Sequence, residues 1–293
     1  MVDYPFTPHY LNLDGPRLHY VDEGHGDPIV LVHGNPTWSY HYRHLIHALA
    51  TDYRVLAPDH IGCGRSDKPA DADYAYTLDR RVADLGRFLD HVEPSRPVTL
   101  LLHDWGGMIG LAWACRQPQR VGRLILGNTA AFPLPAGKPL PLGLRLARMP
   151  LIGPLMVRGL NGFCRAALRW CVTSRKLTAD EQAAYLAPYD SWAHRRAVLR
   201  FVQDIPLRPG DPAWQTVQAT AERLEQFRRH PILILWGRRD FVFDDSFLAE
   251  WRQRWPDAEI KVFESAGHFV FEDAREEAIE LIRDFLKRRP PLS

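Results

Sequence analysis

The stretch TLLLHDWGGMIGLAWA, residues 99–114, places a carboxylate at a sharp turn. Residues 99–103 form a mostly apolar run that predicts a buried strand, and the segment that starts at Trp105 predicts a helix. Two glycines directly after Trp105 let the chain turn tightly between the two elements. We therefore expect Asp104 at the tip of an elbow between a strand and a helix.

A carboxylate at this position has a chemical consequence. The partial positive charge of a helix N-terminus favours the ionised form of Asp104. Unlike a serine hydroxyl, an ionised carboxylate needs no base before it attacks carbon, and the attack leaves an ester or anhydride on the enzyme. The alternative interpretation is an aspartate that only caps the helix.

Two further residues complete a predicted triad. Asp240 follows an apolar run in ILILWGRRDFVF (232–243), and His268 lies in ESAGHFVF (264–271), between the last predicted strand and the last helix. The order nucleophile, acid, histidine is that of the α/β-hydrolase fold. His268 would take a proton from water that attacks the Asp104 ester, and Asp240 would fix its tautomer.

The 293 residues alternate short apolar runs with helical segments, except in one region. Such a chain predicts an α/β protein with an eight-stranded, mostly parallel sheet, helices on both faces and a helical cap inserted after strand 6. We assign residues 1–130 and 213–293 to the two parts of the core and 131–212 to the cap. The predicted strands are HYLNLD (9–14), RLHYVDEG (17–24), PIVLVHG (28–34), YRVLAPDH (53–60), TLLLHDW (99–105), RLILGN (123–128), HPILILWG (230–237) and AEIKVFE (258–264).

The inserted region reads as helices after a proline-rich connector. Helical periodicity covers roughly 154–171, 178–187 and 190–203, and Thr178 with Glu181 forms a capping box for the second segment. A closing helix is expected near 272–288. The insertion leaves the sheet at its carboxyl edge, where such sheets hold ligands, so we expect it to act as a lid.

Composition excludes several classes of function. Lys and Arg number 37 against 35 Asp and Glu, a formal charge of +2, which argues against an electrostatic nucleic-acid binder. The four cysteines form no CxxC pair and no zinc spacing, so no metal and no cofactor is expected. The first residues lack a signal-peptide pattern, and no apolar run approaches the roughly 20 residues of a membrane helix. We therefore expect a cytoplasmic chain without a transmembrane segment.

Five motifs together resemble a known family. They are HGNPTWSY (33–40), DHIGCGRSDKP (59–69), HDWGG (103–107), WGRRD (236–240) and SAGHF (265–269). The chain is similar over nearly its whole length to the α/β-hydrolase superfamily, and specifically to its haloalkane-dehalogenase-like branch. The resemblance implies that Asn35 and Trp105 supply two N–H donors that stabilise a leaving anion.

Epoxide hydrolases share the HDWGG motif, so this motif alone does not identify the substrate. Their pattern has an aromatic residue after His-Gly and a pair of lid tyrosines, whereas this chain has Asn35 in the first place. Tyr185 and Tyr189 could imitate the pair, although lid tyrosines more often serve packing.

A second comparison concerns the triad acid. One subgroup of dehalogenases carries a glutamate after the sixth strand, where this chain has Asn128 and no acid. Asp240 together with Asn35 and Trp105, and the segments 161–168 and 187–211, resemble the β-lactone decarboxylases of bacterial long-chain olefin biosynthesis.

This resemblance implies conversion of a cis-3,4-dialkyl-β-lactone to a long-chain alkene and carbon dioxide. It also implies a complex with lactone synthetase and dehydrogenase partners at the periphery of a membrane. The alternatives are a haloalkane dehalogenase with the same residues, an epoxide hydrolase, and a ligand-binding relative without catalysis. The sequence leaves open whether Asp104 attacks the carbonyl or the ring carbon, and what His268 does in a decarboxylation.

A small apolar substrate of either kind needs an apolar pocket. Aromatic and aliphatic residues of the insertion and beside the acid and histidine are the candidates, although core packing explains each of them as well. They are Phe132, Leu155, Phe163, Leu168, Trp170, Trp192, Phe201, Phe241, Val242, Phe243, Phe269 and Val270.

Overall fold

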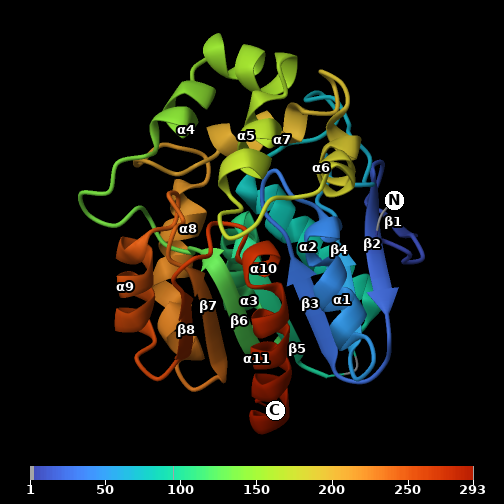
Figure 1. The fold of residues 1–293 in the computed structure, drawn as a ribbon, viewed down its shortest axis with the longest axis vertical. Coiled ribbons are helices and arrows are strands. Elements are labelled where there is room, and N and C mark those ends of the chain that lie inside the picture. The colour runs from blue at the N-terminus through green and yellow to red at the C-terminus, as the bar shows by residue number, and fades with distance from the viewer. Residues whose placement is uncertain (1–2, 95, 293) are drawn as a thin grey trace.

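A single eight-stranded sheet organises the protein (Figure 1). The computed structural model describes residues 3–94 and 96–292. The strand order is β1-β2-β4-β3-β5-β6-β7-β8, antiparallel at β1-β2 and β2-β4 and parallel elsewhere, so the sheet is mostly parallel, as predicted. The strands are β1 (His9–Asn12), β2 (Arg17–Glu23), β3 (Pro28–Val32), β4 (Arg54–Pro58), β5 (Val98–Asp104), β6 (Val121–Thr129), β7 (Ile232–Gly237) and β8 (Glu259–Phe263).

Helices cover both faces of this sheet. The helices are α1 (Arg43–Leu49), α2 (Leu78–Val92), α3 (Trp105–Arg116), α4 (Leu142–Ala147), α5 (Gly162–Trp170), α6 (Ala179–Leu186), α7 (Arg196–Gln203), α8 (Trp214–Arg223), α9 (Asp245–Arg254), α10 (Val270–Asp273) and α11 (Arg275–Arg288). Shorter helical turns are η1 (Ser39–Tyr42), η2 (Pro118–Arg120), η3 (Pro154–Gly159), η4 (Ala187–Tyr189) and η5 (Leu224–Phe227).

The central strands are buried on both sides because their alternate residues enter different cores. Leu100 and Leu102 of β5 pack in the core that α2, α3, α8 and α9 cover. Leu101 points the other way, into the core that α1 and α11 cover. A strand held on both faces is rigid, so the residues at its carboxyl end are held in place as well.

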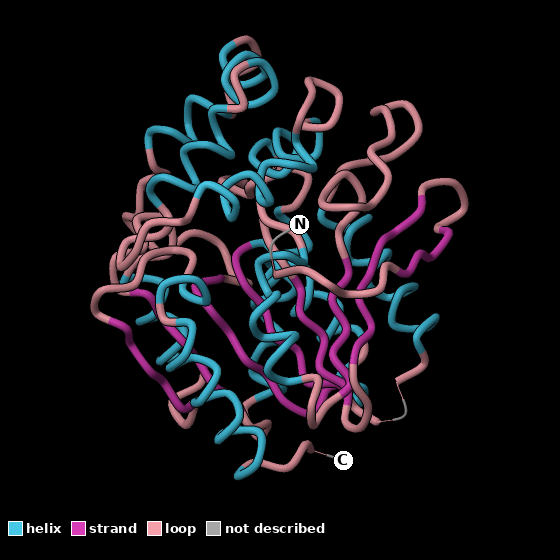
Figure 2. The backbone as a smooth tube through the Cα atoms, turned by 45° about the vertical axis from the view of Figure 1, so that its right-hand side comes forward, coloured by secondary structure: helices cyan, strands magenta, loops and turns pink. Residues whose placement is uncertain are grey.

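Helices α4 to α7 follow β6 and lie over the carboxyl ends of the strands (Figures 1 and 2). The predicted helix at 178–187 agrees with α6, including its capping box. The prediction of one helix over 154–171 was wrong, since η3 and α5 are separated at Asn161, whose φ of 52° is left-handed and ends a helical run.

The prediction of a helix from residue 190 was also wrong at its start, because α7 begins at Arg196. The preceding turn is held by side chains: the Asp190 carboxylate bonds the His194 imidazole, and Ser191 Oγ accepts the His194 N–H. Such local bonds compete with helix formation.

The closing helix is divided into α10 and α11. Within the described residues, no helix combines the length and the apolar character that a membrane span needs.

Candidate active site

Asp104 lies at the end of β5, where α3 begins, as the sequence predicts. Its backbone has φ 52° and ψ −126°, an unusual conformation for a residue with a side chain. The turn is tight: a Cβ at Gly106 would stand 1.9 Å from the Val32 carbonyl oxygen, and one at Gly107 would stand 1.9 Å from Thr129 Oγ1. Only glycine fits at these two positions, and the elbow therefore projects the Asp104 carboxylate above the sheet.

The structure brings Asp240 and His268 to this carboxylate. Asp240 follows β7 and His268 follows β8. His268 Nδ1 lies 2.7 Å from Asp240 Oδ2, and His268 Nε2 lies 3.6 Å from Asp104 Oδ2. The other Asp240 oxygen accepts the Val242 N–H at 2.7 Å, which fixes the carboxylate in place. All three residues are buried.

These charges shift one another's protonation. Burial by itself opposes the imidazolium, but the Asp240 and Asp104 carboxylates raise the pKa of His268 to about 10. Burial likewise opposes the Asp104 carboxylate, yet its contacts with His268 and the Asn35 N–H hold the pKa of Asp104 below its ordinary value. The charged imidazolium form of His268 is therefore favoured in the free protein.

Asn35 contacts Asp104 through its backbone. The Asn35 N–H donates to Asp104 Oδ1 at 2.6 Å, and Gly34 permits this approach because a Cβ there would stand 2.1 Å from the same oxygen. The Asn35 side-chain amide donates to the Val198 carbonyl at 3.2 Å. An amide nitrogen carries two hydrogens, so one hydrogen remains for a ligand.

Trp105 is the other predicted donor. The residue is buried, and its ring lies 5.3 Å from the Phe201 ring. Within the described part of the chain its indole N–H has no hydrogen-bond partner. Asn35 and Trp105 line the same cavity as Asp104 and His268.

This cavity has a volume of about 320 Å³ and extends between the sheet edge and the helices above it. Asn35, Asp104, Trp105 and His268 contribute its polar groups, and nearly all other lining residues are apolar. Of the apolar residues suggested by the sequence, the structure places these in the lining: Phe132, Phe163, Trp170, Phe241, Val242 and Phe243.

The remaining candidates lie elsewhere. Phe201, Phe269 and Val270 are buried in the core, and Leu168 packs against it. Leu155 and Trp192 are exposed on the outer surface. The periodicity of the sequence could not separate these positions, because a helix that lines a cavity and a helix that packs on a core share the same apolar pattern.

Tyr185 and Tyr189 do not line the cavity. The Tyr185 hydroxyl donates to Glu272 at 2.6 Å, and the Tyr189 hydroxyl donates to the Thr37 carbonyl at 3.1 Å. Both are buried and bonded within the protein. They therefore pack the interior instead of facing a substrate as an epoxide-binding pair would.

Sequence reasoning missed two residues that hold the His268 loop. His103 Nε2 lies 2.7 Å from the His268 carbonyl oxygen, and burial together with the His268 charge lowers the pKa of His103 to about 3. The neutral ring therefore donates to that carbonyl. Asp273 accepts the Gly267 N–H at 2.7 Å and N–H groups of Thr173 and Ser174. An aspartate five residues after the histidine is too common a pattern to have signalled this role.

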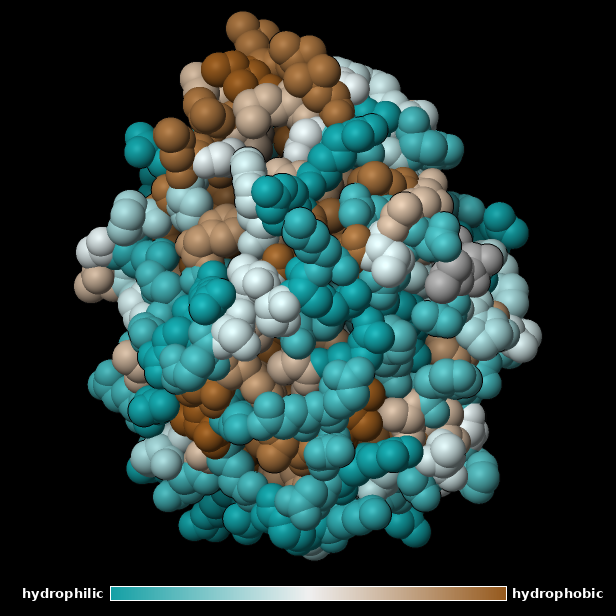
Figure 3. Space-filling model, viewed as in Figure 1, coloured by the Kyte–Doolittle hydropathy of each residue, from teal (hydrophilic) through white to brown (hydrophobic). Residues whose placement is uncertain are grey.

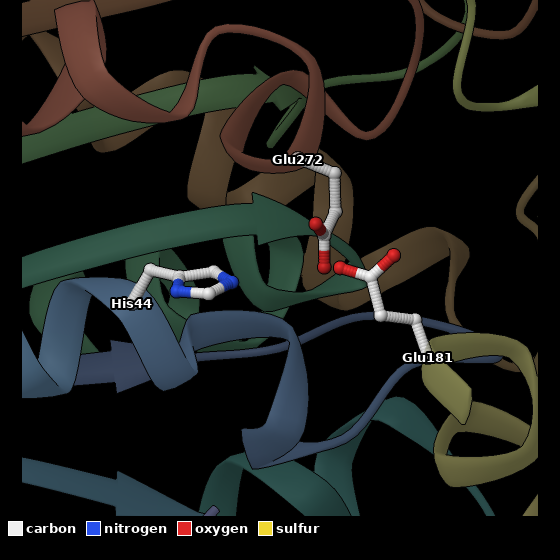
Figure 4. A group of neighbouring side chains, drawn as sticks. All are labelled: His44, Glu181 and Glu272. Atoms are coloured by element: carbon white, nitrogen blue, oxygen red, sulfur yellow. The ribbon is translucent and has the colours of Figure 1, made fainter. Parts of the chain in front are cut away.

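A second group of side chains, outside the triad, offers atoms that could bind a metal ion. Atoms of His44, Glu181 and Glu272 lie within 4.8 Å of one another, a spacing that could suit a metal ion (Figure 4). The two carboxylates, however, already pair with three guanidinium groups. These belong to Arg43, Arg175 and Arg275. Three positive charges against two negative ones do not favour a further cation, so the group is an ion-pair cluster.

The alpha/beta hydrolase fold family model matches residues 27–274 of the chain. The chain belongs to the α/β-hydrolase family. Its eight-stranded sheet and the elbow at Asp104 agree with that membership.

Proteins similar to this α/β hydrolase include two kinds of enzyme. Two are cis-3-alkyl-4-alkyloxetan-2-one decarboxylases. The one from Shewanella oneidensis is 47% identical over 99% of this chain and 91% of its own. The one from Xanthomonas campestris pv. campestris is 45% identical over 98% of each chain. The crystal structure of the haloalkane dehalogenase DatA from Agrobacterium tumefaciens C58 superposes with a TM-score of 0.85, at 29% identity and 96% coverage of both chains.

Proposed function

We propose that this α/β hydrolase is a cis-3,4-dialkyl-β-lactone decarboxylase that releases an alkene and carbon dioxide. The observation that carries the proposal is the 47% identity, over 99% of the chain, to a relative named for that activity. The mostly apolar cavity that Asp104 lines supports it, because a dialkyl lactone has two hydrocarbon chains and one polar ring.

Asp104 is the proposed nucleophile. In the first route, a carboxylate oxygen of Asp104 attacks the saturated ring carbon that is bonded to the ring oxygen. This attack breaks the bond between that carbon and the ring oxygen and frees the lactone carboxylate. The bond between the carboxyl carbon and its neighbour then breaks and releases carbon dioxide. Its electron pair forms the double bond as the ester bond to Asp104 breaks. The atoms balance without water, and Asp104 returns to its starting state. Attack on the carbonyl, giving an anhydride, is the alternative first step.

The N–H groups of Asn35 and Trp105 are the proposed donors to the anion that forms. In the first route, negative charge moves from Asp104 to the released carboxylate. Donors and an imidazolium held ready at the site stabilise that charge without reorganisation. His268, with its pKa raised to about 10 by the two carboxylates despite burial, would supply the positive charge.

A second candidate is haloalkane hydrolysis by the same residues. The Asn35 and Trp105 pair, and the similarity to the dehalogenase structure, favour it. Asp104 would displace halide, and His268 would then take a proton from the water that cleaves the ester. In that ester Asp104 has lost its charge, so the pKa of His268 falls and the ring can act as a base.

The experiment incubates the purified protein, in parallel, with a cis-3,4-dialkyl-β-lactone and with 1-bromobutane. Alkene is measured by gas chromatography and bromide by ion chromatography. Alkene with little bromide supports the decarboxylase, and bromide without alkene overturns it in favour of the dehalogenase. Asp104→Ala should abolish either reaction, while Asp257→Ala, at an exposed site, is the matched control.

The proposal also includes a cap over the site and a complex with partner enzymes. Residues 131–212 would form the cap over the site, and the residues that they contribute to the cavity support this division. A complex with lactone synthetase and dehydrogenase partners at a membrane periphery follows from the family resemblance. Co-purification with the two partners tests the complex.

A further inference from the structure

Helix α7 lies on the inner side of the helices above the sheet, and most of its residues are buried. The outer side of these helices is the hydrophobic surface at the top of the molecule in Figure 3. On the inner side, the Val198 carbonyl of α7 accepts the Asn35 side-chain N–H at 3.2 Å, and the Phe201 ring lies 5.3 Å from the Trp105 ring. Less than one helical turn of α7 therefore contacts both proposed anion donors.

Each of these contacts restricts one donor. A carbonyl oxygen accepts and does not donate, so the Val198 carbonyl fixes which end of the Asn35 amide faces α7 and thereby directs the second N–H of that amide. Phe201 and Trp105 are both buried, so close packing limits the movement of the indole. Phe201 does not line the cavity and therefore contacts the donor instead of the ligand.

A buried ion pair attaches the end of α7 to the core. Asp204 directly follows α7, and its Oδ2 atom lies 3.3 Å from Nη1 of Arg81 on α2. The same oxygen accepts the N–H of Leu78, the first residue of α2, at 2.6 Å. Helix α2 packs against α3, which begins at Trp105. The two bonds of Asp204 therefore hold α7 relative to the helix that carries one of the donors.

Arg81 also contacts α7 directly. The central carbon of its guanidinium lies 3.6 Å from the centre of the Phe201 ring, which is a cation–π contact. Arg81 is 1% exposed, and its ion pair with Asp204 is the only one that it forms within the described residues. A buried charge is costly unless it is paired, so the three side chains depend on one another. We call Arg81, Phe201 and Asp204 the α7 anchor.

We propose that the α7 anchor positions Asn35 and Trp105 for the anion that forms in the reaction. None of the three anchor residues lines the cavity, so they act through α7 and through the Trp105 ring. The inference rests on the two donors assigned under the proposed function. A displacement of about 1 Å, caused by a change away from the reacting atoms, can slow a reaction roughly 10²-fold.

Anion binding tests the donors without any turnover. Tryptophan is labelled with 15N, and the indole signal of Trp105 is assigned by its absence in Trp105→Phe. Sodium bromide is titrated at constant ionic strength, and the shift of this signal gives Kd for bromide. The titration is made at pH 8, because burial raises the pKa of Asp204 to about 6 and its carboxylate is charged at pH 8. We expect saturable binding to the wild type.

Two anchor variants should weaken this binding. Phe201→Leu removes the ring that packs on Trp105 but keeps an apolar side chain and leaves the ion pair in place. Asp204→Asn keeps an acceptor for the Leu78 N–H and removes the negative charge opposite Arg81. We expect Kd for bromide to rise about tenfold in each variant. In assays of alkene formation kcat should fall roughly 10- to 100-fold, with KM changed less than about twofold.

The matched control is Asp71→Asn. Asp71 also ties α7 to the core, through ion pairs with Arg196 and Arg200. Its carboxylate is 42% exposed, and solvent screens such pairs. The variant makes the same chemical change as Asp204→Asn, and it should bind bromide and form alkene like the wild type.

Three results would overturn the positioning role. Bromide could leave the Trp105 signal of the wild type unchanged, in which case the indole is no anion donor. Phe201→Leu could bind bromide as tightly as the wild type, and this variant decides the matter if Asp204→Asn does not fold. Asp71→Asn could lose as much affinity as the anchor variants. A wild type that binds bromide but forms no alkene would refute the decarboxylase and leave the positioning role intact.

Discussion

Asn35 serves Asp104 in two ways, and only one of them depends on its side chain. The backbone N–H donates to Asp104 Oδ1, while the side-chain amide lies on the cavity and donates to the Val198 carbonyl. Asn35→Ala therefore keeps the first bond and removes the proposed donor to the leaving anion. We expect kcat/KM to fall roughly 10²-fold, as it does when such a donor is lost. Steady-state assays of alkene formation measure this, and unchanged turnover would remove Asn35 from the site.

His268 gives a prediction in pH. Burial opposes its charge, but the Asp240 and Asp104 carboxylates raise the pKa of His268 to about 10. If the imidazolium stabilises the released carboxylate, alkene formation should stay constant from pH 6 to roughly 9 and fall as the pH passes about 10. Initial rates across this range measure it. A rate that instead rises with pH through the neutral range would show that His268 acts as a base.

The site residues illustrate what a sequence can predict. The three triad members stand in motifs of fixed order, so their meeting could be predicted from motif and fold. The bond from the Asn35 amide to the Val198 carbonyl could not, because the acceptor belongs to the backbone of a helix more than 160 residues away in the chain. Every residue has a backbone carbonyl, so the amino-acid sequence does not indicate which one accepts this hydrogen bond.

At the scale of elements, the loop that holds His268 is tied to the end of α5. Asp273 of α10 accepts N–H groups from Gly267, Thr173 and Ser174. The Phe269 N–H donates to the Cys171 carbonyl at 2.8 Å. The segment after α5 and the histidine loop are therefore held together by hydrogen bonds, although Thr173 and Gly267 are 94 residues apart along the chain.

Asp273→Asn tests this coupling. The amide replaces one acceptor oxygen with a donor that faces other donors, so at least one N–H loses its partner, at a cost of about 1–3 kcal/mol. We expect kcat to fall about tenfold through displacement of His268, with KM little changed because Asp273 does not line the cavity. Steady-state kinetics separates the two constants. A rise in KM alone would contradict a positioning role, and Asp257→Asn is the control for charge.

Strand and helix prediction succeeded where one pattern dominates. The runs at 28–34 and 99–105 are mostly apolar, and they correspond to the central strands β3 and β5, which are buried on both faces. Helix prediction failed at Asn161 and before Arg196. A left-handed backbone conformation interrupts the helix at the first place, and local side-chain hydrogen bonds replace it at the second. These interruptions depend on single backbone angles and hydrogen bonds, which hydrophobic periodicity does not encode.

Across the whole molecule, one ion-pair cluster joins elements from both ends of the chain. Arg43 of α1 is buried and bonds Glu181 of α6 and Glu272 of α10. Burial opposes both carboxylates, but arginine partners lower the pKa of Glu181 and of Glu272 to about 2. Their contribution to stability is therefore present above the usual glutamate pKa and is lost as the pH falls through about 2.

Arg43→Met should destabilise the whole protein, because it leaves Glu272 buried with one partner fewer. Removing one side of a buried pair costs about 3–5 kcal/mol, which lowers Tm by roughly 10 °C. The deficit should be larger at pH 7 than at pH 4, since the pKa of Glu272 rises in the variant and protonation relieves its buried charge. Calorimetry at both values measures this. Arg288→Met, which breaks exposed pairs with Glu259 and Asp284, should lower Tm much less, because solvent screens ion pairs at the surface. Equal losses in the two variants would mean that the cluster adds no more to stability than a surface pair.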